Sequence, residues 1–143
     1  MRRALLDTDI LSEILKGKNE TVRQRAAAYQ AQLGDFAIST VTVMEVVKGL
    51  HRLGREEAID RFLSGLGMLQ VVPVDTAVAT LAGRIYADLE RTGRPIGRAD
   101  PLVAAAALVH ECDLVTGNVA HFEAVRSVGY PLVIDNWREV APG

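Results

Sequence analysis

The segment Leu5-Leu6-Asp7-Thr8-Asp9 is a short apolar run that ends in two carboxylates. A buried strand of an open α/β sheet can carry an acid at its C-terminal end, which is the edge where such sheets place their sites. Glu45, Asp100 and Asn118 each stand beside a later apolar segment. The pattern therefore predicts a parallel sheet whose carboxyl edge brings together polar side chains from distant parts of the chain.

Apolar strand-like runs and amphipathic stretches alternate along all 143 residues. No repeat or linker divides them, so we expect a single domain over residues 1–143. Alternation of this kind is typical of βαβ units with right-handed crossovers. The predicted strands are residues 3–7, 36–39, 69–74, 114–116 and 132–135, and the predicted helices are residues 9–16, 20–33, 42–53, 55–66, 76–91 and 101–112. The expected fold class is α/β, with a short parallel central sheet flanked by helices.

The composition is that of a soluble globular protein, with 49% hydrophobic and 24% charged residues. The longest apolar stretch, residues 101–109, is too short to span a bilayer, so we expect no membrane association. The single cysteine, Cys112, and the lack of a signal-peptide pattern indicate a cytoplasmic protein, with Cys112 as a buried structural thiol.

The net charge of −2 does not favour a nucleic-acid binder, which usually carries a basic excess. Arg84, Arg91, Arg94 and Arg98 nevertheless lie close together in the sequence. They fit either a solvated helix face with the loop that follows it or a local basic surface.

The acids near the predicted strand ends also have structural interpretations, which the sequence leaves open. Asp7 and Asp9 can each cap the helix that follows, and Asp9 as the cap leaves Asp7 without a structural role. Glu45 stands three residues after Thr42, which matches the capping-box pattern at a helix start.

Asp100 precedes Pro101 and can cap the most apolar predicted helix, with proline at the first helical position. Thr116-Gly117-Asn118 can be a simple turn, and His121 a surface histidine. The joint pattern nevertheless favours a site at one sheet edge. Carboxylate and amide oxygens without paired histidines or cysteines suit Mg²⁺ or Mn²⁺ better than zinc.

Four segments, taken in order, resemble the PIN-domain ribonucleases, and most closely the VapC toxins of bacterial toxin–antitoxin pairs. The matching segments are residues 5–12 (LLDTDILS), 38–45 (ISTVTVME), 93–105 (GRPIGRADPLVAA) and 114–122 (LVTGNVAHF). No segment is specific alone, but the ordered set is. The resemblance implies a PIN-like fold from the first strand almost to the C-terminus.

The resemblance also implies that Asp7, Glu45 and Asp100 are catalytic and bind the metal ion. Asn118 falls at the family's fourth catalytic position, which is often Asp. An amide carries no negative charge and binds Mg²⁺ more weakly than a carboxylate does. This departure argues against a firmly bound second metal ion and leaves open whether one metal ion acts or two.

Other implied residues surround these acids. Thr8, Asp9 and Thr116 are expected to lie behind the metal ligands and to orient carboxylates or water. Arg94 and Arg98 are expected to meet backbone phosphates of RNA. The implied reaction is Mg²⁺-dependent hydrolysis of RNA, with Mn²⁺ as a substitute, by a metal-activated water. The expected substrate is tRNA or rRNA, and the products carry a 5′-phosphate and a 3′-hydroxyl.

The resemblance implies two protein partners, a cognate VapB-like antitoxin and a second copy of the chain in a homodimer. Four apolar residues, Tyr29, Phe36, Leu63 and Leu66, are candidates for exposed positions on such surfaces. Their periodicity does not separate them from core residues.

Two alternative functions stay open. A phosphatase of the haloacid dehalogenase type also begins with a strand and Asp-x-Asp, but Leu11 stands where that signature has Thr or Val, and no lysine follows Lys48. A non-catalytic PIN-like module that binds RNA or protein is favoured only by Asn118 and is opposed by the retention of the three acids.

Overall fold

The computed structural model describes residues 2–142, and within that range five strands form one parallel sheet. The strands are β1 (Ala4–Leu6), β2 (Ala37–Ser39), β3 (Gln70–Val72), β4 (Asp113–Val115) and β5 (Ile134–Asp135), in the spatial order β3-β2-β1-β4-β5. β1 is central, and its Leu5 pairs with Ala37 on one side and Leu114 on the other. The prediction of an α/β fold with a short parallel sheet is confirmed.

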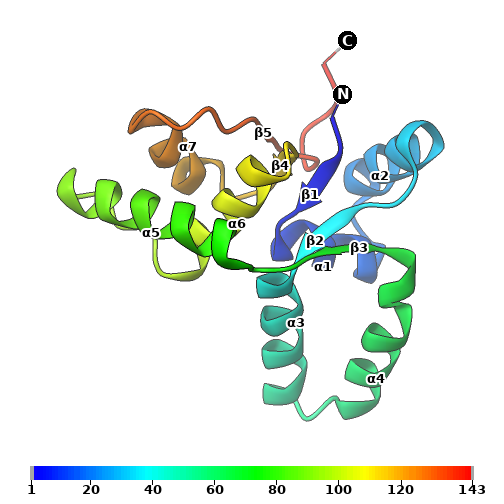
Figure 1. Ribbon diagram of the computed structural model, residues 1–143. Coiled ribbons are helices and arrows are strands. Elements are labelled where there is room, and N and C mark those ends of the chain that lie inside the picture. Colours follow the sequence, from blue (N-terminus) through cyan, green and yellow to red (C-terminus); the bar gives the residue numbers. More distant parts are fainter. Residues whose placement is uncertain (1, 143) are drawn as a thin grey trace.

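Helices cover both faces of this sheet (Figure 1). The helical elements are α1 (Thr8–Lys16), α2 (Glu20–Leu33), α3 (Thr40–Arg52), α4 (Glu56–Ser64), the 3₁₀ helix η1 (Gly65–Met68), α5 (Thr76–Arg91), α6 (Ala99–Val109) and α7 (Val119–Ser127). α5, α6 and α7 lie on one side of the sheet and α1 and α2 on the other, while α3 and α4 form a hairpin that extends away from it. Between residues 2 and 142, no helix has the length and apolar character needed to cross a membrane.

The residues of β1 alternate between two hydrophobic clusters because successive strand side chains point to opposite faces. Leu5 packs with residues of α5, α6 and α7, whereas Ala4 and Leu6 pack with residues of α1 and α2 and with Trp137. Burial on both faces explains why this strand is apolar throughout. α6 is the most enclosed helix, with residues 104–107 fully buried, as its composition predicted. Cys112 is buried as well.

The structure decides between the helix caps that the sequence left open. Asp7, rather than Asp9, occupies the cap of α1 and accepts a hydrogen bond from the backbone N–H of Thr8. α3 begins two residues earlier than predicted because Ser39 caps it, accepting from the N–H of Thr42 at 3.3 Å. That cap excludes the predicted capping box of Thr42 and Glu45, which leaves Glu45 available for other contacts.

The start of α6 also differs from the prediction. It begins at Ala99, so Asp100 lies inside the first turn instead of capping it, and Arg98 holds the cap position without a side-chain hydrogen bond. The carboxylate of Asp100 is therefore not consumed by a backbone cap. α7 was not predicted from the sequence.

The prediction of an exposed apolar surface is wrong for two of its four residues. Tyr29 and Phe36 are 3% and 4% exposed and form an aromatic cluster with Trp137, with ring centroids 5.4–5.7 Å apart. Leu63 is exposed, and Leu66 is half-buried against the same core. The aromatic cluster anchors the segment after β5 to α2.

Candidate active site at the carboxyl edge of the sheet

Asp7 follows β1 directly and is 5% exposed. Its Oδ1 accepts a hydrogen bond from the backbone N–H of Thr8 at 2.9 Å, and its Oδ2 accepts one from the hydroxyl of Thr116 at 2.8 Å. Burial raises the pKa of Asp7 from 3.8 to about 6; the hydrogen bonds oppose this, and the charges of Asp9 and Asp100 add to it. The site therefore holds a buried carboxylate whose charge is poorly compensated.

Glu45 reaches the same edge from α3. The hydroxyl of Thr8 donates a hydrogen bond to Glu45 Oε1 at 2.7 Å, and it lies 3.3 Å from the hydroxyl of Thr42. Thr8 thus contacts both predicted metal ligands, Asp7 through its backbone and Glu45 through its side chain. The orienting role expected for Thr8 stays a prediction.

Asp100 reaches this edge from the first turn of α6. Its Oδ2 lies 3.2 Å from Nδ1 of His121, a residue of α7. Burial raises the pKa of Asp100, the contact with His121 lowers it, and the charges of Glu45 and Asp9 raise it. Asp9 and Asp100 raise the pKa of Asp7, and Glu45 and Asp9 raise the pKa of Asp100, so the four carboxylates lie close enough to interact.

Asp9 has a structural role at the side of this cluster. Its Oδ2 accepts a hydrogen bond from the N–H of Gly117 at 2.8 Å and lies 3.5 Å from Nη1 of Arg138, while Oδ1 accepts from its own neighbour Ile10. Arg138 belongs to the segment after β5 and was not predicted, because no local pattern marks it as part of a site. Asp9 therefore joins α1, the loop after β4 and the C-terminal segment.

Asn118 is exposed at the N-terminal end of α7 and makes no capping hydrogen bond with its side chain. Its backbone N–H donates to the hydroxyl of Thr116 at 3.0 Å. Thr116 thereby connects the loop at Asn118 to Asp7, and its predicted position behind a carboxylate agrees with the structure.

The two predicted RNA-contacting arginines lie in the loop before α6, near Asp100 in sequence but outside its contacts. Arg94 donates a hydrogen bond from Nη1 to the hydroxyl of Ser127 at 3.4 Å. Arg98 is exposed at the cap position of α6. Within residues 2–142, neither forms an ion pair with a carboxylate, so both guanidinium charges are available to an incoming anion.

The carboxylates of Asp7, Glu45 and Asp100 are suitable ligands for a hard cation. In this structure, however, their oxygens are not yet arranged around a common centre. Among residues 2–142, no three side chains of His, Cys, Asp or Glu are already arranged as metal ligands. In that part of the chain Asp7 and Glu45 have no cationic partner, and Asp100 has only His121. Three oxygen donors with uncompensated charge suit Mg²⁺ or Mn²⁺, provided that Thr8 and His121 release Glu45 and Asp100.

The sequence matches the family model described as "PIN domain" over residues 4–127. It is also 34% identical over 126 residues to the protein of Shigella flexneri named tRNA(fMet)-specific endonuclease VapC, an alignment that covers 87% of this chain and 93% of that one. The chain belongs to the PIN-domain family, in its VapC group. This PIN domain is further 29% identical to the Salmonella typhimurium protein of the same name, over 96% of this chain and 99% of that one.

Two solved structures have the same fold as this PIN domain. DNA-bound VapBC from Salmonella typhimurium aligns with a TM-score of 0.78 and 29% identity, over 96% of this chain and 99% of that chain. FitAB bound to an IR36 DNA fragment aligns with a TM-score of 0.82 and 26% identity, over 97% and 98%. Membership of the PIN family excludes the haloacid dehalogenase alternative.

Proposed function

We propose that this PIN domain is a Mg²⁺-dependent endoribonuclease and the toxin of a toxin–antitoxin pair, with tRNA or rRNA as its substrate. The observation that carries the proposal is the convergence of Asp7, Glu45 and Asp100 on one sheet edge, where each lacks a cationic partner within residues 2–142 apart from the contact of Asp100 with His121. The names of the VapC relatives as endonucleases support the same reaction.

In this proposal Asp7, Glu45 and Asp100 would hold the metal ion, and Mn²⁺ would substitute for Mg²⁺. When bound there, the ion would polarise the phosphate of the RNA and lower the pKa of a water molecule. Thr116 orients Asp7, and Thr8 fixes the separation between Asp7 and Glu45. The exposed residues Arg94 and Arg98 pair with backbone phosphates of the RNA. This local positive charge allows RNA to bind although the net charge of the chain is −2.

The proposed protein partners are a VapB-like antitoxin and a second copy of this chain. Solved structures that resemble this protein are named as VapBC complexes, which supports an antitoxin partner. Exposed apolar side chains on the α3–α4 hairpin, Met44, Leu53 and Leu63, offer a surface for such contacts. Location in the cytoplasm and the homodimer are predictions that a gel-filtration and fractionation experiment would test.

A cleavage assay on labelled tRNA and rRNA tests the nuclease. The wild-type protein should cleave in Mg²⁺ or Mn²⁺ and lose activity with EDTA, and Asp7→Asn should lose about a thousandfold or more because it removes a metal ligand's charge. Asp60→Asn, an exposed acid on α4, is the matched control and should retain activity. Cleavage that survives Asp7→Asn would refute the proposal, and metal-independent RNA binding without cleavage would favour the non-catalytic module.

A further inference from the structure

A groove of about 470 Å³ lies between the loop of residues 92–98 and α7. Its apolar walls come from Pro95 and Ile96 on the loop and from Ala120 and Ala124 on the helix. On the helix wall Ala120 is exposed, whereas Ala124 is buried in the core. The volume falls within the range of roughly 300–1,000 Å³ that is usual for small-molecule sites.

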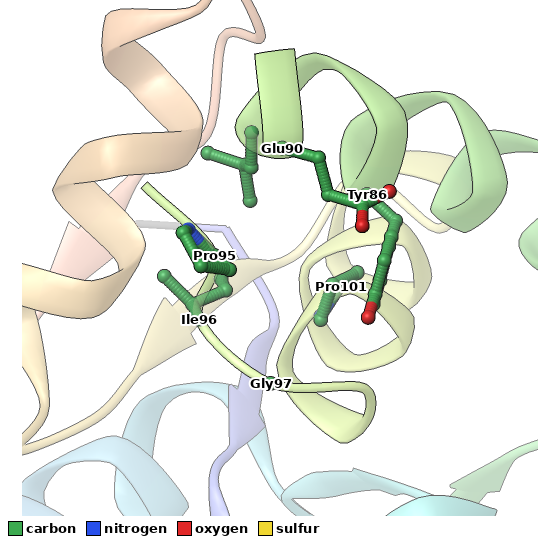
Figure 2. A pocket seen from close by; sticks show the side chains of 7 residues that line it. Tyr86, Glu90, Pro95, Ile96, Gly97 and Pro101 are labelled. Carbon is green, nitrogen blue, oxygen red and sulfur yellow. The ribbon is translucent and has the colours of Figure 1, made fainter. Parts of the chain in front are cut away.

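The loop wall of this groove packs against α5 and α6 on its other side. Figure 2 shows Pro95 and Ile96 facing Tyr86 and Glu90 of α5, with Pro101 of α6 beside them. The space between these residues leaves no volume that a water molecule could occupy. The loop therefore rests against α5 and α6, and the open side of Pro95 and Ile96 is the side that faces α7.

The groove is continuous with the proposed active site through His121. The imidazole of His121 lines the groove, and its Nδ1 lies 3.2 Å from Oδ2 of Asp100. A molecule in the groove would thus contact His121, which in turn contacts the proposed metal ligand Asp100.

The charges around the groove favour an anion with an apolar part. Arg94 lines it and is held by Ser127, a residue of the opposite wall, at 3.4 Å. The one acid of the lining, Glu123, is paired with Arg126 at 3.0 Å, so its charge is offset. With Glu123 paired to Arg126, Arg94 is the charged residue of the lining that has no oppositely charged partner among residues 2–142, and it lies beside the apolar walls.

We propose that this groove binds one nucleotide of the RNA that flanks the phosphate to be cleaved, with its base against the apolar walls and its phosphate at Arg94. The assignment rests on the proposed ribonuclease function and names a second contact for its substrate. Apolar side chains such as those of Pro95 and Ile96 can contact the face of any base without reading its edge, because every base has a π-face. A peptide strand is less well suited, because the lining residues belong to a helix and a loop and offer no free strand edge.

Paired substitutions at equivalent helix positions test the groove. Ala120 and Ala77 are both exposed and are both the second residue of a helix, α7 and α5 respectively. Ala120→Glu places a carboxylate in the groove and should raise KM for RNA cleavage about tenfold or more, with most of the loss in KM rather than kcat. Ala77→Glu, outside the groove, should leave both constants as in the wild type. Thermal unfolding confirms that each variant is folded.

A second variant and a direct binding measurement complete the test. Arg94→Gln, at an exposed position, should also raise KM and reduce its dependence on salt, since one phosphate contact is lost. In NMR titrations of full-length Asp7→Asn protein with UMP, CMP, AMP or GMP, amide shifts should concentrate at residues 94, 96, 97 and 120–127.

The outcomes separate this inference from the nuclease proposal. If the wild type cleaves RNA and Ala120→Glu retains its KM, the groove assignment is wrong while the nuclease stands. If Ala120→Glu weakens only the binding of a VapB-like antitoxin, the groove serves a protein and the assignment is also wrong. If the wild type does not cleave RNA, the nuclease proposal fails, and the nucleotide titration alone decides the groove: shifts there support it and their absence refutes it.

Discussion

The hydroxyl of Thr116 donates a 2.8 Å hydrogen bond to Oδ2 of Asp7, and both residues are buried. This contact links the ends of two adjacent strands, β4 and β1, at the point where the proposed metal ion binds. It favours the charged form of Asp7, whereas burial favours the neutral form. Thr116 thus keeps a buried carboxylate closer to the ionised state that metal binding requires.

Thr116→Val should raise the pKa of Asp7 above its value of about 6, because the hydrogen bond that lowers this pKa is lost while the shape is kept. RNA cleavage at neutral pH should fall about tenfold, since metal binding then competes with protonation. The pKa is measured by carbon-13 NMR of the carboxylate in metal-free protein. Thr116→Ser keeps the hydroxyl and is the control; equal pKa values in the valine and serine variants would contradict the assignment.

The raised pKa of Asp7 predicts how the stability of the metal-free protein depends on pH. Burial raises this pKa from 3.8 to about 6, so the folded state binds the proton more tightly than the unfolded chain does. Unfolding free energy should therefore fall as pH rises from about 4 to 6, by up to about 3 kcal/mol for this group. Urea unfolding across that range measures the slope, and Asp100 should add to it in the same direction.

Asp7→Asn provides the matched comparison for this pH dependence. The amide stays neutral, so the variant should lose most of the slope and be more stable than the metal-free wild type at neutral pH. Added Mg²⁺ should stabilise the wild type and leave the variant unchanged, because only the wild type binds the ion. A variant with the wild-type slope would show that another group titrates.

The element order was predictable from the sequence because hydrophobic periodicity records which face of each element is buried. The run before Asp7 read correctly as a buried strand, and the all-apolar α6 as a buried helix. Helix starts were less predictable, because several residues at each start can cap. Ser39 and Thr42 both have the required hydroxyl, and only the direction of the chain leaving β2 selects Ser39.

The contacts within the site depend on tertiary structure that no local pattern records. Arg138 meets Asp9 across 129 positions of sequence only because Trp137 is anchored between Tyr29 and Phe36. The contact of His121 with Asp100 depends on α7, whose apolar residues show too weak a helical pattern to be recognised. The acids themselves were identifiable because their residue types and order carry the family resemblance, but their role in metal binding is still a prediction.

Gly117 is the position where the loop after β4 passes closest to this C-terminal arginine. A Cβ atom at Gly117 would stand 2.1 Å from Nη1 of Arg138 and 2.6 Å from Oδ2 of Asp9. Gly117→Ala should therefore displace the flexible, partly exposed side chain of Arg138 from Asp9 and destabilise the protein by about 1 kcal/mol.

A double-mutant cycle with Arg138→Ala separates the two clashes at Gly117. In the Arg138→Ala background Gly117→Ala should cost less, since only the contact with Asp9 is left, and the difference should be about 0.5 kcal/mol or more. Urea unfolding of the four proteins gives this coupling energy. Strict additivity would mean that Arg138 does not occupy the space above Gly117. Gly83→Ala, at an exposed helix position with open space around its Cβ, is the control and should not destabilise.

Asn118→Asp tests whether the fourth family position limits metal binding. Asn118 is exposed beside Thr116, which holds Asp7, so a carboxylate there would add negative charge at the edge of the proposed site. Mg²⁺ and Mn²⁺ prefer carboxylate oxygens to amide oxygens, and we expect the affinity for Mn²⁺ to rise about tenfold. Isothermal titration calorimetry of metal-free protein with Mn²⁺ measures affinity and stoichiometry together. A second equivalent of Mn²⁺ in the variant would show that Asn118 restricts the wild type to one ion, whereas an unchanged affinity would place residue 118 outside the coordination sphere. Asn19→Asp, at the cap of α2, adds the same charge outside the proposed site and should leave the affinity as in the wild type.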